Sequence, residues 1–293
     1  MSAPGTRGGV VRAIALGLGT GVAIGLAGAP RELFGAALAG PGLLLLALAP
    51  SPDTLVPWRG AMLAGTAAGF ATGALCCAWV IDLLTTFAYM PLPVAALLGA
   101  LLWLGQSAPW ALAAVLARAV APALPLWIGL PLAISAAHTL APMIFPWRLG
   151  VSLTPWIPFV QCAELGGLPL LDFLVAAFSC GVVEVMRRAG RPAEKKVPVL
   201  AGAPRERWHA PALAAAAALA LPLAYGAVRL PAVRAERDAA PLLRVGLVQP
   251  FFTVEDRRDS LLRGPQHRLL LAMPREVEGA GGDLVTWPES AYA

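Results

Sequence analysis

The chain has 293 residues, of which 58% are apolar and only 13% are charged. Soluble proteins carry roughly 25% charged residues, so this composition excludes a wholly soluble globule and indicates that lipid surrounds most of the chain. The formal net charge of +5 does not indicate a nucleic-acid partner, because the basic residues cluster beside an apolar segment, as membrane topology requires.

Seven apolar segments are candidates for crossing a bilayer, which takes about 17–25 helical residues. They are residues 10–29, 33–50, 60–83, 93–119, 123–141, 165–187 and 210–230. The first segment also resembles a signal peptide, but a second apolar segment follows almost at once, which favours a retained span. The sequence therefore predicts a polytopic α-helical membrane domain with about seven spans over residues 1–230.

The connector at residues 187–209 sets the expected orientation, because connectors rich in lysine and arginine stay in the cytoplasm. It is the most basic connector of the chain, with Arg187, Arg188, Arg191, Lys195, Lys196, Arg205 and Arg207 against Glu194 and Glu206. Counting back six spans places the N-terminus, with Arg7 and Arg12, in the cytoplasm as well. Counting forward one span places everything after about residue 231 on the extracytoplasmic side.

The connector at residues 142–164 falls on the extracytoplasmic side in this topology and is rich in aromatic residues. Phe145, Trp147, Trp156 and Phe159 suit the membrane–water interface, where amphipathic rings are stable. Two interpretations are open at this point. The connector is either an aromatic belt and nothing more, or a loop that lines the entrance of a lipid-handling site.

The four cysteines are Cys76, Cys77, Cys162 and Cys180. Cys76 and Cys77 are adjacent and point to different faces of a helix, and Cys180 sits in an apolar run. Because no spacing among them is typical of a metal site or a disulfide, we interpret them as small packing residues. We expect no metal and no cofactor.

After a linker at residues 231–241, residues 242–293 have the pattern of a soluble α/β domain. The segment 242–250 is a compact apolar strand, and 265–282 begins as a helix that loosens at Pro274. Residues 283–287 form a second strand. Strand, helix and strand make one βαβ unit, which cannot cover both faces of its own parallel sheet.

Glu289 follows the second strand, where α/β domains present catalytic side chains. Pro288 fixes the direction in which the chain leaves that strand. By position alone, an exposed structural glutamate is the simpler interpretation.

Two motifs of the tail, VGLVQP and DLVTWPESA, resemble the start of the carbon–nitrogen hydrolase (nitrilase) domain. Preceded by seven spans, they resemble apolipoprotein N-acyltransferase. In the membrane part, AWVIDLLTTFAYMP (78–91) resembles a Trp-Val…Phe…Met-Pro segment of that family. FPW (145–147) and ELGGLPLLDFLV (164–175) resemble its outer loop and next helix.

The resemblance implies acyl transfer at the outer face of the bacterial cytoplasmic (inner) membrane. A Glu–Lys–Cys triad works by ping-pong: the cysteine thiolate takes an acyl group from a phospholipid, and the amine of a lipoprotein's S-diacylglyceryl-cysteine then accepts it. Glu289 matches the general base. Trp79, Phe145, Trp147 and Trp156 are candidates for lipid contact. The implied partners of this monomeric protein are the phospholipid donor, the diacylglyceryl lipoprotein acceptor and membrane lipids.

The sequence departs from the family pattern in two places. The family's lysine and cysteine follow the glutamate, but only four residues follow Glu289, and nothing brings Cys162 near it. EDRRD (255–259) stands where the family usually shows a Lys-Trp pair, so an aromatic substrate contact there is in doubt, although Phe251 and Phe252 could compensate. We therefore expect an incomplete, inactive form of a longer enzyme.

Two other functions remain open from the sequence. The first is a non-catalytic membrane scaffold or lipid-binding protein, which the missing lysine and cysteine favour. The second is a membrane-anchored nitrilase-type amidohydrolase that acts on a soluble amide. Such an enzyme would not need an aromatic loop that faces lipid.

Overall fold

The structure is a computed structural model, and it describes residues 7–51, 54–190 and 209–287. The chain divides into two compact units, Met1–Pro231 and Ala232–Ala293, and each unit is described by itself.

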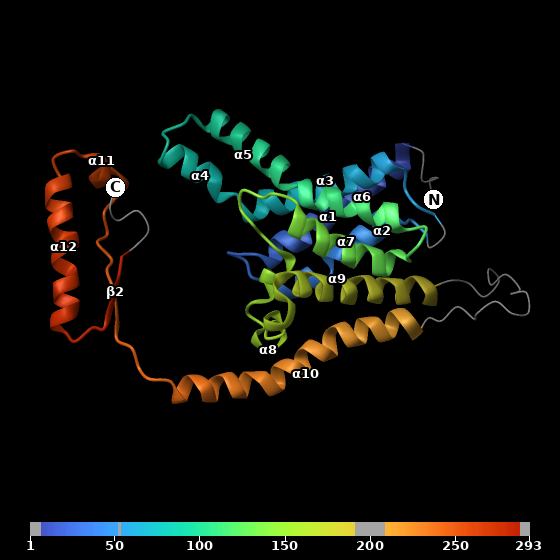
Figure 1. Cartoon of the computed structure of the whole chain (residues 1–293). Helices are drawn as coiled ribbons and strands as arrows, with labels where there is room; N and C mark the ends of the chain where they lie inside the picture. The colour runs from blue at the N-terminus through green and yellow to red at the C-terminus, as the bar shows by residue number, and fades with distance from the viewer. Residues whose placement is uncertain (1–6, 52–53, 191–208, 288–293) are drawn as a thin grey trace, which may run out of the picture. The chain divides into compact units, whose positions relative to one another are not determined.

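The first unit is helical (Figure 1). Its elements in chain order are α1 (Arg7–Ala27), η1 (Phe34–Leu38), α2 (Gly40–Leu48), α3 (Trp58–Cys76), α4 (Trp79–Thr86), α5 (Leu92–Gln106), α6 (Ala108–Val120), α7 (Leu126–Leu140), η2 (Leu149–Leu153), α8 (Ile157–Val160), α9 (Ala163–Ala189) and α10 (His209–Ala239), whose last residues belong to the second unit.

Four helical stretches are long and apolar enough to cross a membrane: Arg7–Ala27, Leu92–Val120, Ala163–Ala189 and His209–Ala239. The pair α3 and α4 is bent by 54° at a short break and counts as a fifth span if it is taken as one unit. Two further apolar stretches, Phe34–Leu48 and Leu126–Leu140, are shorter. Each predicted segment therefore contains an apolar helix, while the number of seven spans stays a prediction.

Proline and glycine explain why two of the predicted segments form short helices. Helix α7 begins after Pro125 and ends at Leu140, because Ala141 is extended ahead of Pro142. A 15-residue helix is only about 22 Å long, against roughly 30 Å of hydrocarbon. The stretch Phe34–Leu48 consists of a short 3-10 turn and then a helix that starts at Gly40 with Pro41 in its first turn.

Small residues allow α1 and α3 to pack backbone against backbone. A Cβ at Gly17 would overlap the carbonyl oxygen of Ala64, and one at Gly21 would overlap that of Ala68. Close approach through small residues is a general means of packing helices in lipid, where burial of apolar surface gives no advantage.

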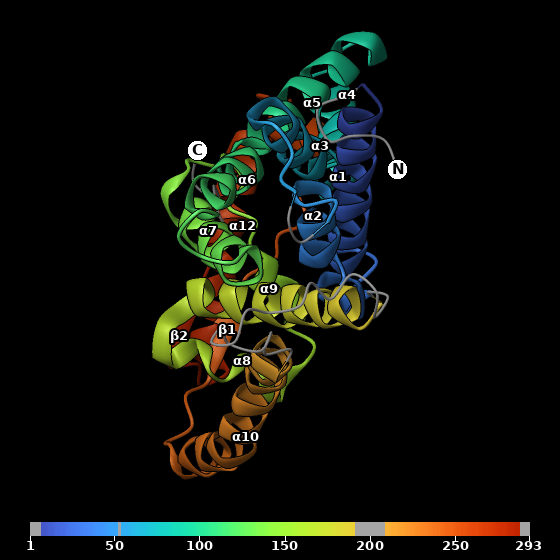
Figure 2. The same ribbon diagram turned by 90° about the vertical axis from the view of Figure 1, so that its right-hand side faces the viewer.

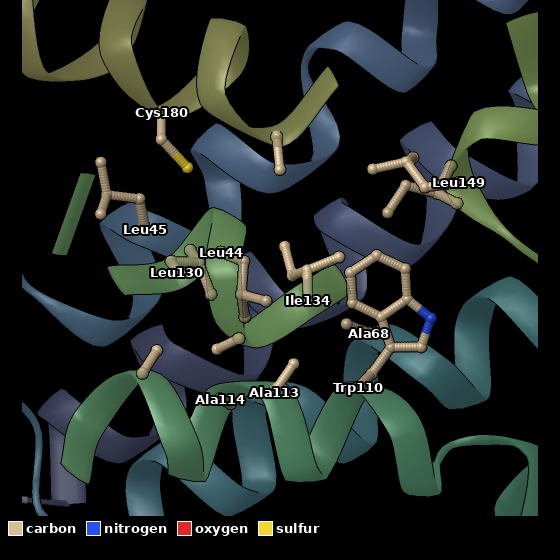
Figure 3. Packing of buried hydrophobic residues seen from close by; sticks show 14 of the residues in the cluster. Leu44, Leu45, Ala68, Trp110, Ala113, Ala114, Leu130, Ile134, Leu149 and Cys180 are labelled. Carbon is tan, nitrogen blue, oxygen red and sulfur yellow. The ribbon is translucent and has the colours of Figure 1, made fainter. Parts of the chain in front are cut away.

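The buried core of this unit includes residues of α1 and α3, and one part of it lies between the four helices α2, α6, α7 and α9. Helix α7 lies between α6 and α9 (Figure 2). Side chains from all four helices point into one space (Figure 3); they include Leu44, Leu45, Trp110, Ala113, Ala114, Leu130, Ile134 and Cys180. The Cys180 thiol is fully buried and donates to the carbonyl oxygen of Pro41 at 3.7 Å.

The second unit contains β1 (Val245–Leu247), α11 (Val254–Arg258), α12 (Arg263–Gly279) and β2 (Leu284–Thr286). The two strands pair in parallel, with Val245 opposite Leu284 and Leu247 opposite Thr286. They are shorter than the sequence predicts. The order strand, helix, strand is present, and α12 packs closely on β1, because a Cβ at Gly246 would overlap the side chain of Val277.

Helix α12 continues through Pro274 to Gly279, although the sequence predicts that it loosens at that proline. Helix α11 begins with a capping box: the Asp256 amide donates to the Thr253 hydroxyl, and the Thr253 amide donates to the Asp256 carboxylate. The aliphatic side chains of Leu242 and Leu247 are exposed. A two-stranded sheet alone leaves such apolar surface uncovered.

Candidate functional site at the aromatic loop

The predicted general base, Glu289, lies outside the described residues. The description ends just before it, where β2 is followed by Trp287, whose indole nitrogen donates to the Leu270 carbonyl oxygen at 3.4 Å. The position of the Glu289 carboxylate relative to the membrane helices therefore stays a prediction.

Three of the other predicted residues, Phe145, Trp147 and Trp156, lie within residues 142–164, which we call the aromatic loop, and Trp79 lies in α4. Phe145 and Trp79 of α4 pack edge to face, with ring centroids 5.2 Å apart. Trp156 stacks on Phe159 at 5.2 Å and also contacts Phe34. Two of the four lipid-contact candidates are thus in contact with each other, while Trp156 lies in a separate aromatic cluster.

The most exposed apolar side chains of this region are aliphatic and were missed by the sequence analysis. Ile144 is 72% exposed and Leu140, at the end of α7, is 74% exposed, whereas Phe145, Trp147 and Trp156 are half-buried. Residues 144 and 145 lie in a bend of the chain, so the sequence pattern alone gave no clear signal for the exposure of Ile144. The loop therefore presents aliphatic side chains outward and uses its rings for packing.

Gln106, the last residue of α5, binds the backbone of the aromatic loop through both ends of its amide. Its Nε2 donates to the Phe145 carbonyl oxygen at 2.7 Å, and its Oε1 accepts from the Ile144 amide at 2.9 Å. The same Phe145 oxygen accepts from the Trp147 amide at 2.8 Å, which closes a tight turn. Gln106 was not among the residues predicted from the sequence.

Asp172 of α9 fixes a second point of the loop. Its side chain is fully buried; Oδ1 accepts from the Gly150 amide at 2.8 Å, and Oδ2 accepts from Arg148 Nε at 3.0 Å. Arg148 also donates from Nη2 to the Thr139 hydroxyl at 2.9 Å. A buried carboxylate is tolerated only when it is paired and hydrogen-bonded in this way.

A cavity of about 20 Å³ lies among α3, α5, α6, α7 and the loop, lined by residues that include Thr72, Cys76, Gln106, Trp110, His138 and Trp147. His138 is 2% exposed, and its ring meets Trp110 edge to face at 4.7 Å. Its Nδ1 lies 2.9 Å from the Ile134 carbonyl oxygen, so Nδ1 carries the proton, and Nε2 has no hydrogen-bond partner within the described residues. The cavity has room for about one water molecule.

Helix α10 contacts the far end of the loop through Gly226, whose Cα lies against the backbone of Pro158. Nearby, Arg229 Nε donates to Glu164 at 2.8 Å, and the Tyr225 hydroxyl also donates to Glu164. The loop therefore has contacts with α4, α5, α7, α9 and α10.

Among the described residues of the aromatic loop, the one cysteine is Cys162. Burial raises the pKa of the Cys162 thiol, which donates to the Phe159 carbonyl oxygen at 3.2 Å, so the thiol stays protonated and unreactive. Within residues 7–51, 54–190 and 209–287, no group of three or more histidine, cysteine, aspartate or glutamate residues could hold a metal ion.

Several apolar helices of span length, together with an aromatic loop fixed to them by buried polar side chains, define a helical membrane protein. The model of one protein family, the apolipoprotein N-acyltransferase N-terminal domain, matches residues 20–181. The chain belongs to this family. The comparison with curated proteins found no match. The matched range runs from α1 into α9 and includes the aromatic loop, Gln106 and Asp172.

Proposed function

We propose that this chain serves the transfer of a fatty acyl group from a membrane phospholipid to the N-terminal amine of S-diacylglyceryl-cysteine in lipoproteins. The observation that carries the proposal is the family match over residues 20–181. The aromatic loop supports it, because apolar side chains beside interfacial rings suit a substrate that stays in the bilayer.

The proposed topology has seven spans in the bacterial inner membrane, with a cytoplasmic N-terminus. In this topology, two short apolar stretches cross the membrane together with their flanking residues: η1 joined to α2 is one, and α7 is the other. The bent pair α3 and α4 counts as one span. The basic connector at 187–209 supports this orientation. The parallel β1 and β2 with α12 then begin a nitrilase-like extracytoplasmic domain, and the protein works as a monomer.

In the proposed mechanism, Glu289 removes the proton of a cysteine thiol, and the thiolate attacks the ester carbonyl of the phospholipid. The lysophospholipid leaves with a proton, and a thioester remains. The lipoprotein amine then attacks the thioester, the thiolate leaves, and Glu289 takes the amine proton. A lysine stabilises the oxyanion in both steps.

Within the 293 residues, the last lysine is Lys196 and the last cysteine is Cys180. A polypeptide made of these residues alone therefore lacks a thiolate that could carry the acyl group beside Glu289, and we expect it to be inactive. One alternative is a non-catalytic scaffold or lipid-binding protein, which would give no acylated product in the assay described below. A nitrilase-type amidohydrolase is the other, and a soluble amide substrate would distinguish it.

The test is an acylation assay with a phospholipid labelled in its acyl chain and a diacylglyceryl lipopeptide, read by mass spectrometry of the N-acylated product. The protein encoded by the gene is expressed in membranes, and Glu289→Gln is expected to abolish the product while membrane insertion is unchanged. Glu278→Gln, at an exposed glutamate of α12, is the matched control. An active Glu289→Gln variant would remove Glu289 from the mechanism.

A further inference from the structure

The backbone of the aromatic loop is fixed at two points that lie six residues apart. At the first point, Gln106 both donates to the Phe145 carbonyl oxygen and accepts from the Ile144 amide. At the second, Asp172 accepts from the Gly150 amide and pairs with Arg148. The segment between these points carries Phe145 and Trp147, so its conformation decides where both rings lie.

Each of these two side chains hydrogen-bonds to backbone groups that have no partner in a helix or a strand. Ile144 and Phe145 lie outside any helix or strand, and their peptide groups bond to Gln106 instead of to a helical turn. An unpaired peptide group next to lipid is costly, because hydrocarbon offers no replacement partner. The two side chains therefore hold the loop in one conformation where the backbone alone would not.

The conformation that they fix has a defined outward face. It turns Ile144 outward, 72% exposed, and it places Phe145 edge to face against Trp79, which is itself partly exposed. Arg148 pairs with the buried Asp172 and its side chain is only 13% exposed, so this cation does not face the lipid side of the loop as a free charge.

We propose that Gln106 and Asp172 are positioning residues: they hold the aromatic loop so that Ile144 and the Trp79–Phe145 pair meet the acyl chains of the phospholipid donor. The proposal rests on the proposed function for the identity of the lipid. Neither residue touches the reacting atoms; each acts through the backbone of the loop.

The first measurement is hydrogen–deuterium exchange of the full chain in lipid nanodiscs, and it does not depend on any activity. Gln106→Leu is expected to speed exchange of peptides covering residues 143–147 on the order of ten-fold, because one hydrogen bond is lost and another group is left unpaired. Asp172→Leu is expected to speed exchange of peptides covering residues 148–151 by a similar factor. The milder Asp172→Asn keeps an oxygen for the Gly150 amide and should have a smaller effect, which also covers the case in which Asp172→Leu does not fold.

The second measurement uses a phosphatidylethanolamine with a photoactivatable acyl chain, and cross-links are mapped by mass spectrometry. In both Gln106→Leu and Asp172→Asn, cross-links to residues 142–151 are expected to fall several-fold. Cross-links to α5, whose Leu97 and Leu101 are exposed, should stay unchanged and report that the bundle is intact. If acyl transfer is measurable, KM for the phospholipid should rise several-fold with little change in kcat.

Gln161→Leu is the matched control for exchange, because the bond of the Gln161 side chain within the described part of the chain is a local one, to the Ile157 carbonyl oxygen four residues earlier. Wild-type exchange and cross-linking in Gln106→Leu would overturn the proposal. So would faster exchange of the loop with unchanged cross-links to it, or an equal loss of cross-links at α5. Absence of acyl transfer by the protein encoded by the gene would contradict the proposed function. The exchange and cross-linking measurements would still test the positioning roles of Gln106 and Asp172, because neither depends on activity.

Discussion

Gly226 of α10 lies so close to Pro158 of the aromatic loop that a Cβ at position 226 would overlap the Pro158 carbonyl oxygen. The contact joins two segments 68 residues apart, and the Tyr225 and Arg229 side chains bond to Glu164 beside it. Helix α10 therefore packs against the loop at a position where only glycine leaves enough space.

We predict that Gly226→Ala displaces α10 from the loop and lowers the free energy of unfolding by about 1–3 kcal/mol, as overpacking does in other cores. Thermal unfolding in detergent measures the change. Gly105→Ala is the control, since an added Cβ there has nothing within 4 Å, and it should be neutral or slightly stabilising. Equal melting temperatures for Gly226→Ala and the wild type would contradict the close packing.

The two ion pairs that anchor the loop should differ in strength. Asp172 is fully buried, whereas Glu164 and Arg229 are each about a third exposed. Asp172→Ala should cost about 3–5 kcal/mol, because it leaves Arg148 partly buried without its partner. Glu164→Gln should cost much less than Asp172→Ala, because solvent screens the exposed pair of Glu164 with Arg229. Thermal unfolding of the two variants side by side tests the order, and the reverse order would refute it.

For His138 we predict a substitution that does not lower the stability of the protein. His138→Phe removes the unpartnered Nε2 and keeps the ring contact with Trp110, so stability should be unchanged or higher by about 1 kcal/mol. The measurement is again the melting temperature, with His138→Ala as the comparison that loses the ring and should destabilise. A clear loss of stability in His138→Phe would mean that Nε2 has a partner that matters.

The capping box of α11 should be visible in a titration. The hydrogen bond from the Thr253 amide holds the pKa of the Asp256 carboxyl below its ordinary value of 3.8. A lowered pKa in the folded state means that the ionised carboxylate stabilises the start of α11 above the ordinary pKa, and that this contribution is lost as the pH falls through the lowered one. The carboxyl ¹³C shift of Asp256 reports this pKa.

The Thr253 hydroxyl is also part of this capping box. Thr253→Ala should raise the pKa of Asp256 towards its ordinary value, and Thr253→Ser should not, because serine keeps the hydroxyl. An unchanged pKa in Thr253→Ala would show that the capping box does not form.

The proposed topology can be tested without any activity. A reporter fused near residue 200 should be cytoplasmic and one fused near residue 245 should be exported, because the basic connector stays inside and α10 crosses once more. Detection of both reporters in the same compartment would contradict a span at α10 and would place Glu289 on the wrong side.

The sequence was sufficient for the positions of the apolar helices, because composition alone marks such segments and proline marks several of their ends. It was not sufficient for the bend between α3 and α4, which occurs at a short break around Cys77 with no proline or glycine in it. Gln106 and Asp172 were also missed. The partners of the two side chains lie 22 to 39 residues away in the chain, so only the tertiary fold reveals the pairing.

Gln106 is the last residue of α5, and its side chain also hydrogen-bonds to the backbone of the aromatic loop. Helix α5 cannot change its tilt without pulling on the peptide groups of Ile144 and Phe145. Tilting is one way in which a helix adapts to a thinner or thicker bilayer. A tilt of α5 would therefore reach the backbone of the aromatic loop through the Gln106 amide.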